Sequence, residues 1–158
     1  MITNGMKWMQ KYSTLITEII SILFILLFVY AAVSKLVDFA NFQAQLGQSP
    51  MLTYFAKSIS FLVPGAELLL SIGLAFNRYR LIAFYGVLGL MSAFTMYIIT
   101  ILNFSDYIPC SCGGILENMG WTTHLIFNML FVVLAIIGIL LISQPYNPPA
   151  LSYQIDER

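Results

Sequence analysis

Long runs of apolar residues, separated by short polar stretches, make up most of this sequence. In the second half, no charged residue lies between Arg80 and Asp106 or between Glu117 and Asp156. The first half contains two similar runs, each interrupted by at most two charges. Because roughly 20 mainly apolar residues allow a helix to cross a bilayer, the pattern predicts four membrane-spanning helices. Their expected ranges are 14–37, 57–77, 81–103 and 121–143.

The composition indicates the same class of protein. Hydrophobic residues make up 59% of the 158 residues and charged residues only 9%, whereas about a quarter of a soluble domain is charged. The mean hydropathy is +0.86. The four runs and their short connections leave no room for a soluble domain. We therefore predict an all-α integral membrane four-helix bundle, with residues 1–158 forming a single transmembrane domain.

A short segment between the first two runs has a different pattern. In "DFANFQAQLGQS", the apolar residues Phe39, Phe42 and Leu46 recur at helical spacing with polar residues between them. This pattern is typical of a helix that lies along a membrane interface. We expect a short amphipathic interfacial helix here, on the same side of the membrane as the loop between the third and fourth spans.

The basic residues predict the orientation of the chain. Lys7 and Lys11 precede the first span and Arg78 and Arg80 lie between the second and third, whereas the loop between the third and fourth spans has no Lys or Arg. The positive-inside rule places both termini, with the tail 144–158, in the cytoplasm and that loop outside. A cleaved N-terminal signal peptide is the alternative, although the first run exceeds the usual 7–15 apolar residues of a signal. The net charge of zero predicts no nucleic-acid partner.

The loop before the fourth span contains both cysteines of the chain, in "IPCSCGGILENMGWTTH". A bent Cys-Ser-Cys can bring the Cα atoms of Cys110 and Cys112 within the 4.4–6.8 Å range of a disulfide. So small a ring is strained, and strain makes a disulfide more readily exchanged. On the outer side of a membrane, where disulfides persist, this spacing indicates an exchange-active pair.

Residues near the start of the fourth span add to this chemistry. We expect Asn118, Thr122 or Thr123 to cap the helix, whose positive end then favours a cysteine thiolate. His124 falls in or near the first turn and is a candidate base. Trp121 suits the interfacial belt of the membrane.

Two other interpretations of the loop remain open. Cys110 and Cys112 can form a purely structural bridge, although closing so short a loop stabilises a fold only weakly. A metal site built from both cysteines, His124 and Glu117 is conceivable by residue type, but its spacing matches no known pattern. The favoured assignment is catalytic for Cys110, Cys112 and His124, with no metal.

The charges inside the first two spans also need explanation. Glu67 should face the bundle interior with a partner or be protonated, because a charge in the bilayer centre costs about 2.5–3.5 kcal/mol. We expect Pro64 and Gly65 to break the helical bonding there and open a polar pocket. A neutral Glu67 bonded to a Ser, Thr, Tyr or Asn is one interpretation, and proton handling or quinone binding is the other. Lys35 is expected to anchor at the surface, by snorkelling or by pairing with Asp38.

Three stretches together resemble the MauE branch of the DoxX-like membrane proteins, over residues 18 to 142. They are "YAAVSKLVDFANFQAQLGQSP", "PGAELLLSIGL" and "IPCSCGGILENMGWTTHLIFN". The resemblance implies a four-helix bundle in a bacterial inner membrane, where the orientation predicted above puts the cysteine loop in the periplasm. It implies disulfide formation with a thioredoxin-like periplasmic partner during maturation of methylamine dehydrogenase, and DoxX-like relatives are linked to quinones. By resemblance, Cys110 and Cys112 are the redox pair, and Lys35 and Glu67 are matching polar positions.

Two functions follow from these observations. The first is a membrane thiol-disulfide oxidoreductase whose Cys110–Cys112 loop exchanges electrons with the thioredoxin-like partner and with a quinone, for which Glu67, Lys35 and Trp121 are the candidate binding residues. The second is a non-enzymatic small subunit of a larger membrane complex, with a structural Cys110–Cys112 clip.

Overall fold

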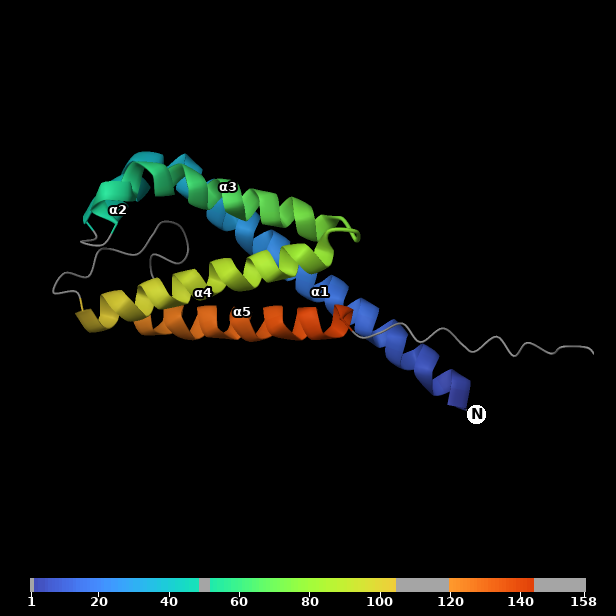
Figure 1. Ribbon diagram of the computed structural model, residues 1–158. Coiled ribbons are helices and arrows are strands. Elements are labelled where there is room, and N and C mark those ends of the chain that lie inside the picture. Colours follow the sequence, from blue (N-terminus) through green and yellow to red (C-terminus); the bar gives the residue numbers. More distant parts are fainter. Residues whose placement is uncertain (1, 49–51, 105–119, 144–158) are drawn as a thin grey trace, which may run out of the picture.

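The structure, a computed structural model, describes residues 2–48, 52–104 and 120–143 (Figure 1). These residues form five α-helices and one short 3-10 helix, with no strand among them, and the predicted all-α class is confirmed. The elements are α1 (Ile2–Val37), α2 (Phe39–Gln48), η1 (Thr53–Phe55), α3 (Ala56–Ala75), α4 (Arg80–Phe104) and α5 (Trp121–Ile142).

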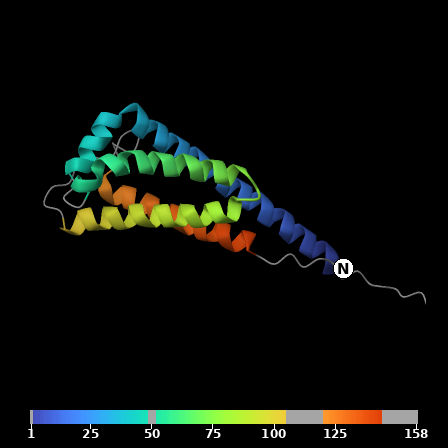
Figure 2. The same ribbon diagram turned by 45° about the horizontal axis from the view of Figure 1, so that its top comes forward.

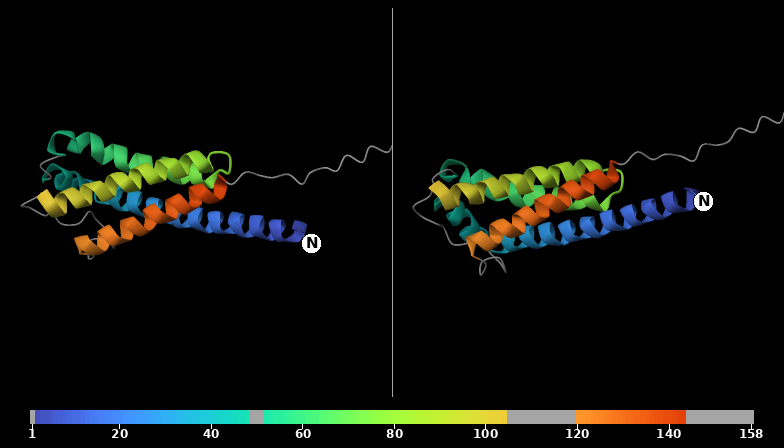
Figure 3. Two further views of the ribbon diagram at one scale, coloured as in Figure 1. Left: turned by 60° about the horizontal axis from the view of Figure 1, so that its bottom comes forward. Right: turned by 90° about the horizontal axis from the view of Figure 1, so that it is seen from below.

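The four long helices form a bundle in which each packs against two neighbours. Helices α1 and α4 each contact both α3 and α5, and Figure 2 shows the four lying along one common direction. Helix α2 lies at one end of the bundle, where α4 ends and α5 begins; we call this the α2 end. The start of α1 and the end of α5 lie at the opposite end, as both views of Figure 3 show.

The outer faces of the bundle are strongly apolar. The structure contains four helices long and apolar enough to cross a membrane, at Tyr12–Val37, Thr53–Ala75, Arg80–Asn103 and Trp121–Ile142. Large apolar side chains point outward from all four, including Leu26, Leu69, Ile82 and Ile126, each more than half exposed. So continuous an apolar surface is suited to lipid and not to water. The chain is a multi-pass membrane protein.

Aromatic packing holds the centre of the bundle. Phe24 of α1 is completely buried, and its ring meets Phe84 of α4 edge-on at 6.1 Å and Phe131 of α5 at 5.3 Å between ring centroids. Apolar lipid provides no hydrophobic driving force for helix association, so close packing of this kind has to hold the helices together. Edge-to-face rings add about 0.5–1.5 kcal/mol per pair.

Buried hydroxyl groups are satisfied within their own helices. Thr17, Ser21, Ser71 and Thr95 each donate a 2.8 Å hydrogen bond to the carbonyl oxygen four residues earlier. Polar groups in a bilayer need such internal partners because no water is available. These side chains are therefore structural, and none of these four buried hydroxyl groups is left unpaired.

The predicted amphipathic helix is present as α2. Phe42 and Leu46 are buried against the bundle, and the Phe39 ring packs on Phe61 of α3 with 4.7 Å between centroids. Helix α3 continues from Ala56 to Ala75 with Pro64 buried inside it, so the predicted loss of helical bonding at Pro64 does not interrupt the helix. Proline lacks one N–H, and a membrane helix tolerates the loss of that single bond when neighbouring helices pack around it.

Candidate functional site

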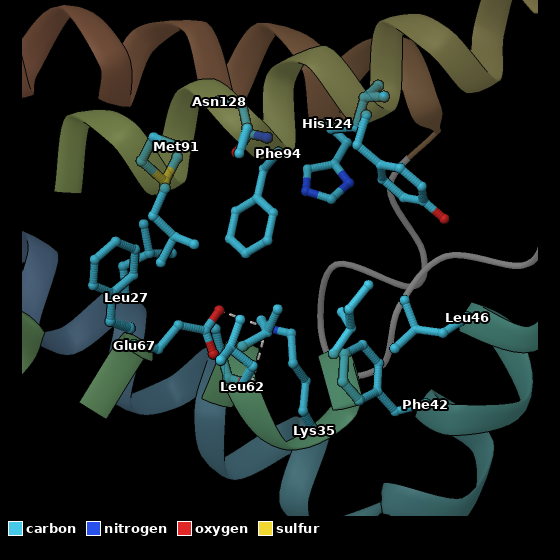
Figure 4. A pocket seen from close by; sticks show the side chains of 18 of the residues that line it. Leu27, Lys35, Phe42, Leu46, Leu62, Glu67, Met91, Phe94, His124 and Asn128 are labelled. Atoms are coloured by element: carbon cyan, nitrogen blue, oxygen red, sulfur yellow. Dashed lines mark hydrogen bonds and ion pairs between the residues drawn. The ribbon is translucent and has the colours of Figure 1, made fainter. Parts of the chain in front are cut away.

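A largely apolar pocket of about 360 Å³ extends from the α2 end into the bundle (Figure 4). All five α-helices contribute to its lining, and its volume falls within the range of about 300–1,000 Å³ typical of small-molecule sites. Most of the lining side chains are Leu, Ile, Val, Phe or Met. The polar groups and polar-tipped rings among the lining residues are Lys35, Glu67, Tyr97, Trp121, His124 and Asn128.

A buried ion pair crosses one wall of the pocket. Lys35 Nζ donates to Glu67 Oε1 at 2.8 Å, and the side chains are only 13% and 1% exposed. The same ammonium donates to the Ala31 carbonyl oxygen at 3.3 Å. It also lies 5.9 Å from the ring centroids of Phe42 and Phe94, within the range of cation–π attraction. The Lys35 ammonium group thus interacts with four groups inside the bundle.

This geometry corrects two expectations. The expected surface anchoring of Lys35 is wrong, because its side chain turns inward to Glu67, where α1 packs along α3. The expectation that Glu67 faces the interior with a partner is confirmed, but that partner is a cation and not a hydroxyl or amide. An unpaired charge in a low-dielectric interior is very costly, so each residue explains the burial of the other.

Asn128 was missed by the sequence analysis. It lies on α5, is 4% exposed, and lines the pocket. Its Nδ2 has no hydrogen-bond partner among the described residues, and neither does Glu67 Oε2. The available signal was that Asn128 is the single amide side chain in the very apolar segment 121–142.

The start of α5 brings Trp121 and His124 into the pocket. Helix α5 begins at Trp121, preceded by Gly120 at the N-cap with no side-chain capping bond. The expected cap by Thr122 or Thr123 is therefore wrong, since both lie inside the first turn, and Asn118 falls outside the described residues. His124 is in the first turn as predicted, with its ring centroid 6.4 Å from that of Trp121.

The pocket therefore unites four of the six predicted site residues: Lys35, Glu67, Trp121 and His124. The other two, Cys110 and Cys112, lie outside the described residues, as does Glu117. Residues 105–119 join Phe104 of α4 to Gly120 before α5, and both of these attachment points belong to the α2 end. Within the part of the chain that the structure describes, no three His, Cys, Asp or Glu side chains form a cluster suited to a metal.

Comparison with known proteins identifies the family. No curated protein and no solved structure matches the chain significantly. The sequence model described as "Methylamine utilisation protein MauE" matches residues 13–141. This stretch covers more than three quarters of the chain and includes nearly all of the four spans, the ion pair and the cysteine segment. The chain therefore belongs to the MauE family of membrane proteins.

Proposed function

We propose that this protein is a thiol-disulfide oxidoreductase of the bacterial inner membrane. Cys110 and Cys112 form the exchanging pair, a thioredoxin-like periplasmic protein is the partner, and a quinone in the pocket is the electron acceptor. The family description links its members to methylamine utilisation. We infer that the corresponding step is disulfide formation during maturation of methylamine dehydrogenase.

One observation carries the proposal. The buried Lys35–Glu67 pair lies in an apolar pocket at the α2 end, and the segment with Cys110 and Cys112 is attached to the helices of that same end. An apolar cavity of this volume with a few convergent polar groups is the usual form of a small-molecule site. Ionisable residues inside a membrane bundle are costly and commonly mark function.

The exchange step balances with one cysteine pair. A thiolate of the partner attacks one sulfur of the Cys110–Cys112 disulfide and forms a mixed disulfide, and the second partner thiolate then attacks the partner's sulfur. The partner loses two electrons and becomes a disulfide. Cys110 and Cys112 gain those electrons and leave as thiols after taking up two protons. Since the sequence has two cysteines, no second internal pair takes part.

The pocket residues fit a bound quinone. When bound, a quinone supplies an acceptor for two electrons and two protons, which returns the cysteine pair to the disulfide. The aromatic side chains of Phe94 and Trp121 offer flat apolar surfaces for a ring, and Asn128 offers an unpaired amide N–H. Lys35 keeps Glu67 in place, and His124 stands between the interior and the attachment point of the cysteine segment.

The redox state of the cysteines in cells tests the proposal. Cells are acid-quenched and their thiols alkylated with a mass-adding maleimide, before and after a short pulse of dithiothreitol. We expect a Cys110–Cys112 disulfide that is reduced by the pulse, is restored quickly afterwards, and returns more slowly when respiratory quinone is depleted. A Cys110→Ser variant should leave the partner reduced, whereas the matched Ser111→Ala variant should not.

The opposite results favour the alternative function. Cysteines that remain in one state through the pulse would indicate a structural clip in a small subunit of a larger membrane complex. Normal oxidation of the partner by the Cys110→Ser variant would exclude the redox proposal.

A further inference from the structure

Two buried polar atoms in the pocket have no hydrogen-bond partner within the part of the chain that the structure describes. Glu67 is 1% exposed and Asn128 is 4% exposed, yet Glu67 Oε2 and Asn128 Nδ2 make no hydrogen bond to any described residue. Leaving such a group unpaired is unfavourable, so folded proteins contain few of them. Both belong to the same pocket, and they come from different helices, α3 and α5. The pair points to a ligand that bonds both.

The two atoms lie on opposite walls. In Figure 4, Glu67 and Lys35 occupy one side of the pocket, Asn128 and His124 occupy the other, and the ring of Phe94 lies between the two sides. Lys35 uses Oε1 of Glu67, which leaves Oε2 as a hydrogen-bond acceptor. The Asn128 nitrogen is a donor. The pocket thus presents an acceptor and a donor across an apolar middle.

Three kinds of membrane molecule differ in their ability to form hydrogen bonds with both atoms. An acyl chain fills the apolar space but bonds neither atom. A benzoquinone has carbonyl oxygens that accept from Asn128, but those oxygens have no hydrogen to give Glu67 Oε2. A ring with hydroxyl groups at opposite positions donates one O–H to the carboxylate and accepts from the amide with the other oxygen.

We propose that the pocket binds the hydroquinone form of a quinone couple more tightly than the quinone form, with Glu67 Oε2 accepting from one hydroxyl group and Asn128 Nδ2 donating to the other. The choice of the quinone couple rests on the proposed function; the preference for the reduced ring rests on the two unpaired atoms. A site that favours the reduced ring draws electrons toward it, and each tenfold preference raises the potential of the bound couple by about 30 mV. This shift favours electron flow from the cysteine pair to the ring, which is the direction of a thiol oxidase.

Binding to a protein without cysteines tests this preference separately from the redox proposal. The full chain with Cys110→Ser and Cys112→Ser, purified in detergent, is titrated with a decyl benzoquinone, its hydroquinone and the dimethyl ether of that hydroquinone. Trp121 fluorescence in a Trp8→Phe background reports binding, with calorimetry as a second readout. We expect the hydroquinone to bind at least about tenfold more tightly than the other two, since one charge-assisted hydrogen bond accounts for a factor of that size.

Two variants assign the preference to the two atoms. Glu67→Gln should abolish the preference for the reduced ring. Asn128→Leu should weaken the binding of both the quinone and the hydroquinone about five- to tenfold, in line with the loss of one neutral hydrogen bond, and should keep the preference for the hydroquinone. The matched control is Gln45→Met, because Gln45 Oε1 is also buried and unpartnered but Gln45 does not line the pocket. It should leave all affinities unchanged.

Three results would overturn the proposal: equal binding of the three compounds, an undiminished preference in Glu67→Gln, or full affinity in Asn128→Leu. If Glu67→Gln does not fold, the three-compound comparison on the parent and the Asn128→Leu variant still decide. A reduced-ring preference in the cysteine-free protein, together with cysteines that stay locked in cells, would retain this site and reject the thiol chemistry. Absence of a reduced-ring preference, together with cysteines that are reduced and reoxidised in cells, would reject this site and retain the thiol chemistry.

Discussion

The ammonium group of Lys35 on α1 lies 2.8 Å from Oε1 of Glu67 on α3, although the two residues are 32 positions apart in the sequence. Both side chains are buried, Glu67 almost completely. In a low-dielectric interior the two charges neutralise each other, and neither is tolerated alone. The pair therefore ties the first two spans together and fixes the carboxylate that faces the pocket.

We first predict that breaking this pair on one side is worse than removing it altogether. Lys35→Met leaves the Glu67 charge buried and unpaired, which should lower the free energy of unfolding by about 3–5 kcal/mol. The double variant Lys35→Met/Glu67→Leu should lose clearly less, because it leaves no charge behind. Unfolding in mixed detergent micelles, followed by circular dichroism, measures the difference.

The matched control is Lys57→Met, which removes an exposed lysine near the start of α3. It should change the free energy of unfolding very little. A double variant less stable than Lys35→Met would contradict the prediction, because it would mean that Glu67 stabilises the fold through contacts other than the ion pair.

A second prediction concerns Gly138 on α5. A Cβ atom there would lie 2.5 Å from Cε1 of Phe84 and 2.8 Å from its Cζ. Phe84 is completely buried and packs edge-on against Phe24, so its ring has no room to withdraw. Gly138→Ala should therefore destabilise the bundle by about 1–3 kcal/mol, as overpacked cores usually do, in the same micelle unfolding measurement.

Two glycines on α4 serve as comparisons for the Gly138→Ala variant. A Cβ at Gly89 has nothing within 4 Å, so Gly89→Ala should be neutral or slightly stabilising because alanine favours the helix. A Cβ at Gly86 would meet Cδ2 of Leu70, the mobile end of a flexible side chain, and Gly86→Ala should fall between the other two. Equal effects at Gly138 and Gly89 would refute the steric argument.

The sequence predicted the helices well because their signals are local. The length of each apolar run sets a membrane span, and the spacing of Phe42 and Leu46 marks the buried face of α2. Such patterns depend on residues a few positions apart on one helix. His124 could be placed in a first turn for the same reason.

The site was less predictable because its contacts are not local. Lys35 has an acidic neighbour in Asp38, so a nearby pairing was the natural interpretation, but its partner lies on a different helix. The continuity of α3 through Pro64 depends on the packing of the surrounding helices. Asn128 gained its significance only when α5 was placed opposite Glu67. None of these relationships has a fixed spacing in the sequence.

A third prediction concerns how α2 closes the pocket. Phe42 is 6% exposed and lines the pocket beside Lys35. Phe42→Ala should release α2 from the bundle, because the helix is short and Phe42 and Leu46 are its buried residues. Hydrogen exchange of residues 39–48 should then become markedly faster in micelles. Tyr54→Ala removes a comparable ring from a side chain that is 93% exposed, and should leave that exchange unchanged. Equal protection of α2 in both variants would show that it is held by other contacts.

The last prediction concerns the side of the membrane that the cysteines face. Lys35 points to Glu67 inside the bundle, so Lys57 is the remaining described Lys or Arg near the α2 end, whereas Arg78 and Arg80 lie at the opposite end. The charge bias is therefore stronger than the sequence alone indicated, and from the positive-inside rule we predict that the α2 end faces the periplasm. After reduction, a membrane-impermeant maleimide should label Cys110 and Cys112 in intact cells.

As the control, a Ser143→Cys variant without the native cysteines should be labelled only after the membrane is permeabilised, because Ser143 follows α5 at the opposite end. The reverse labelling pattern would place the pocket's end in the cytoplasm, where a periplasmic partner cannot reach the cysteines.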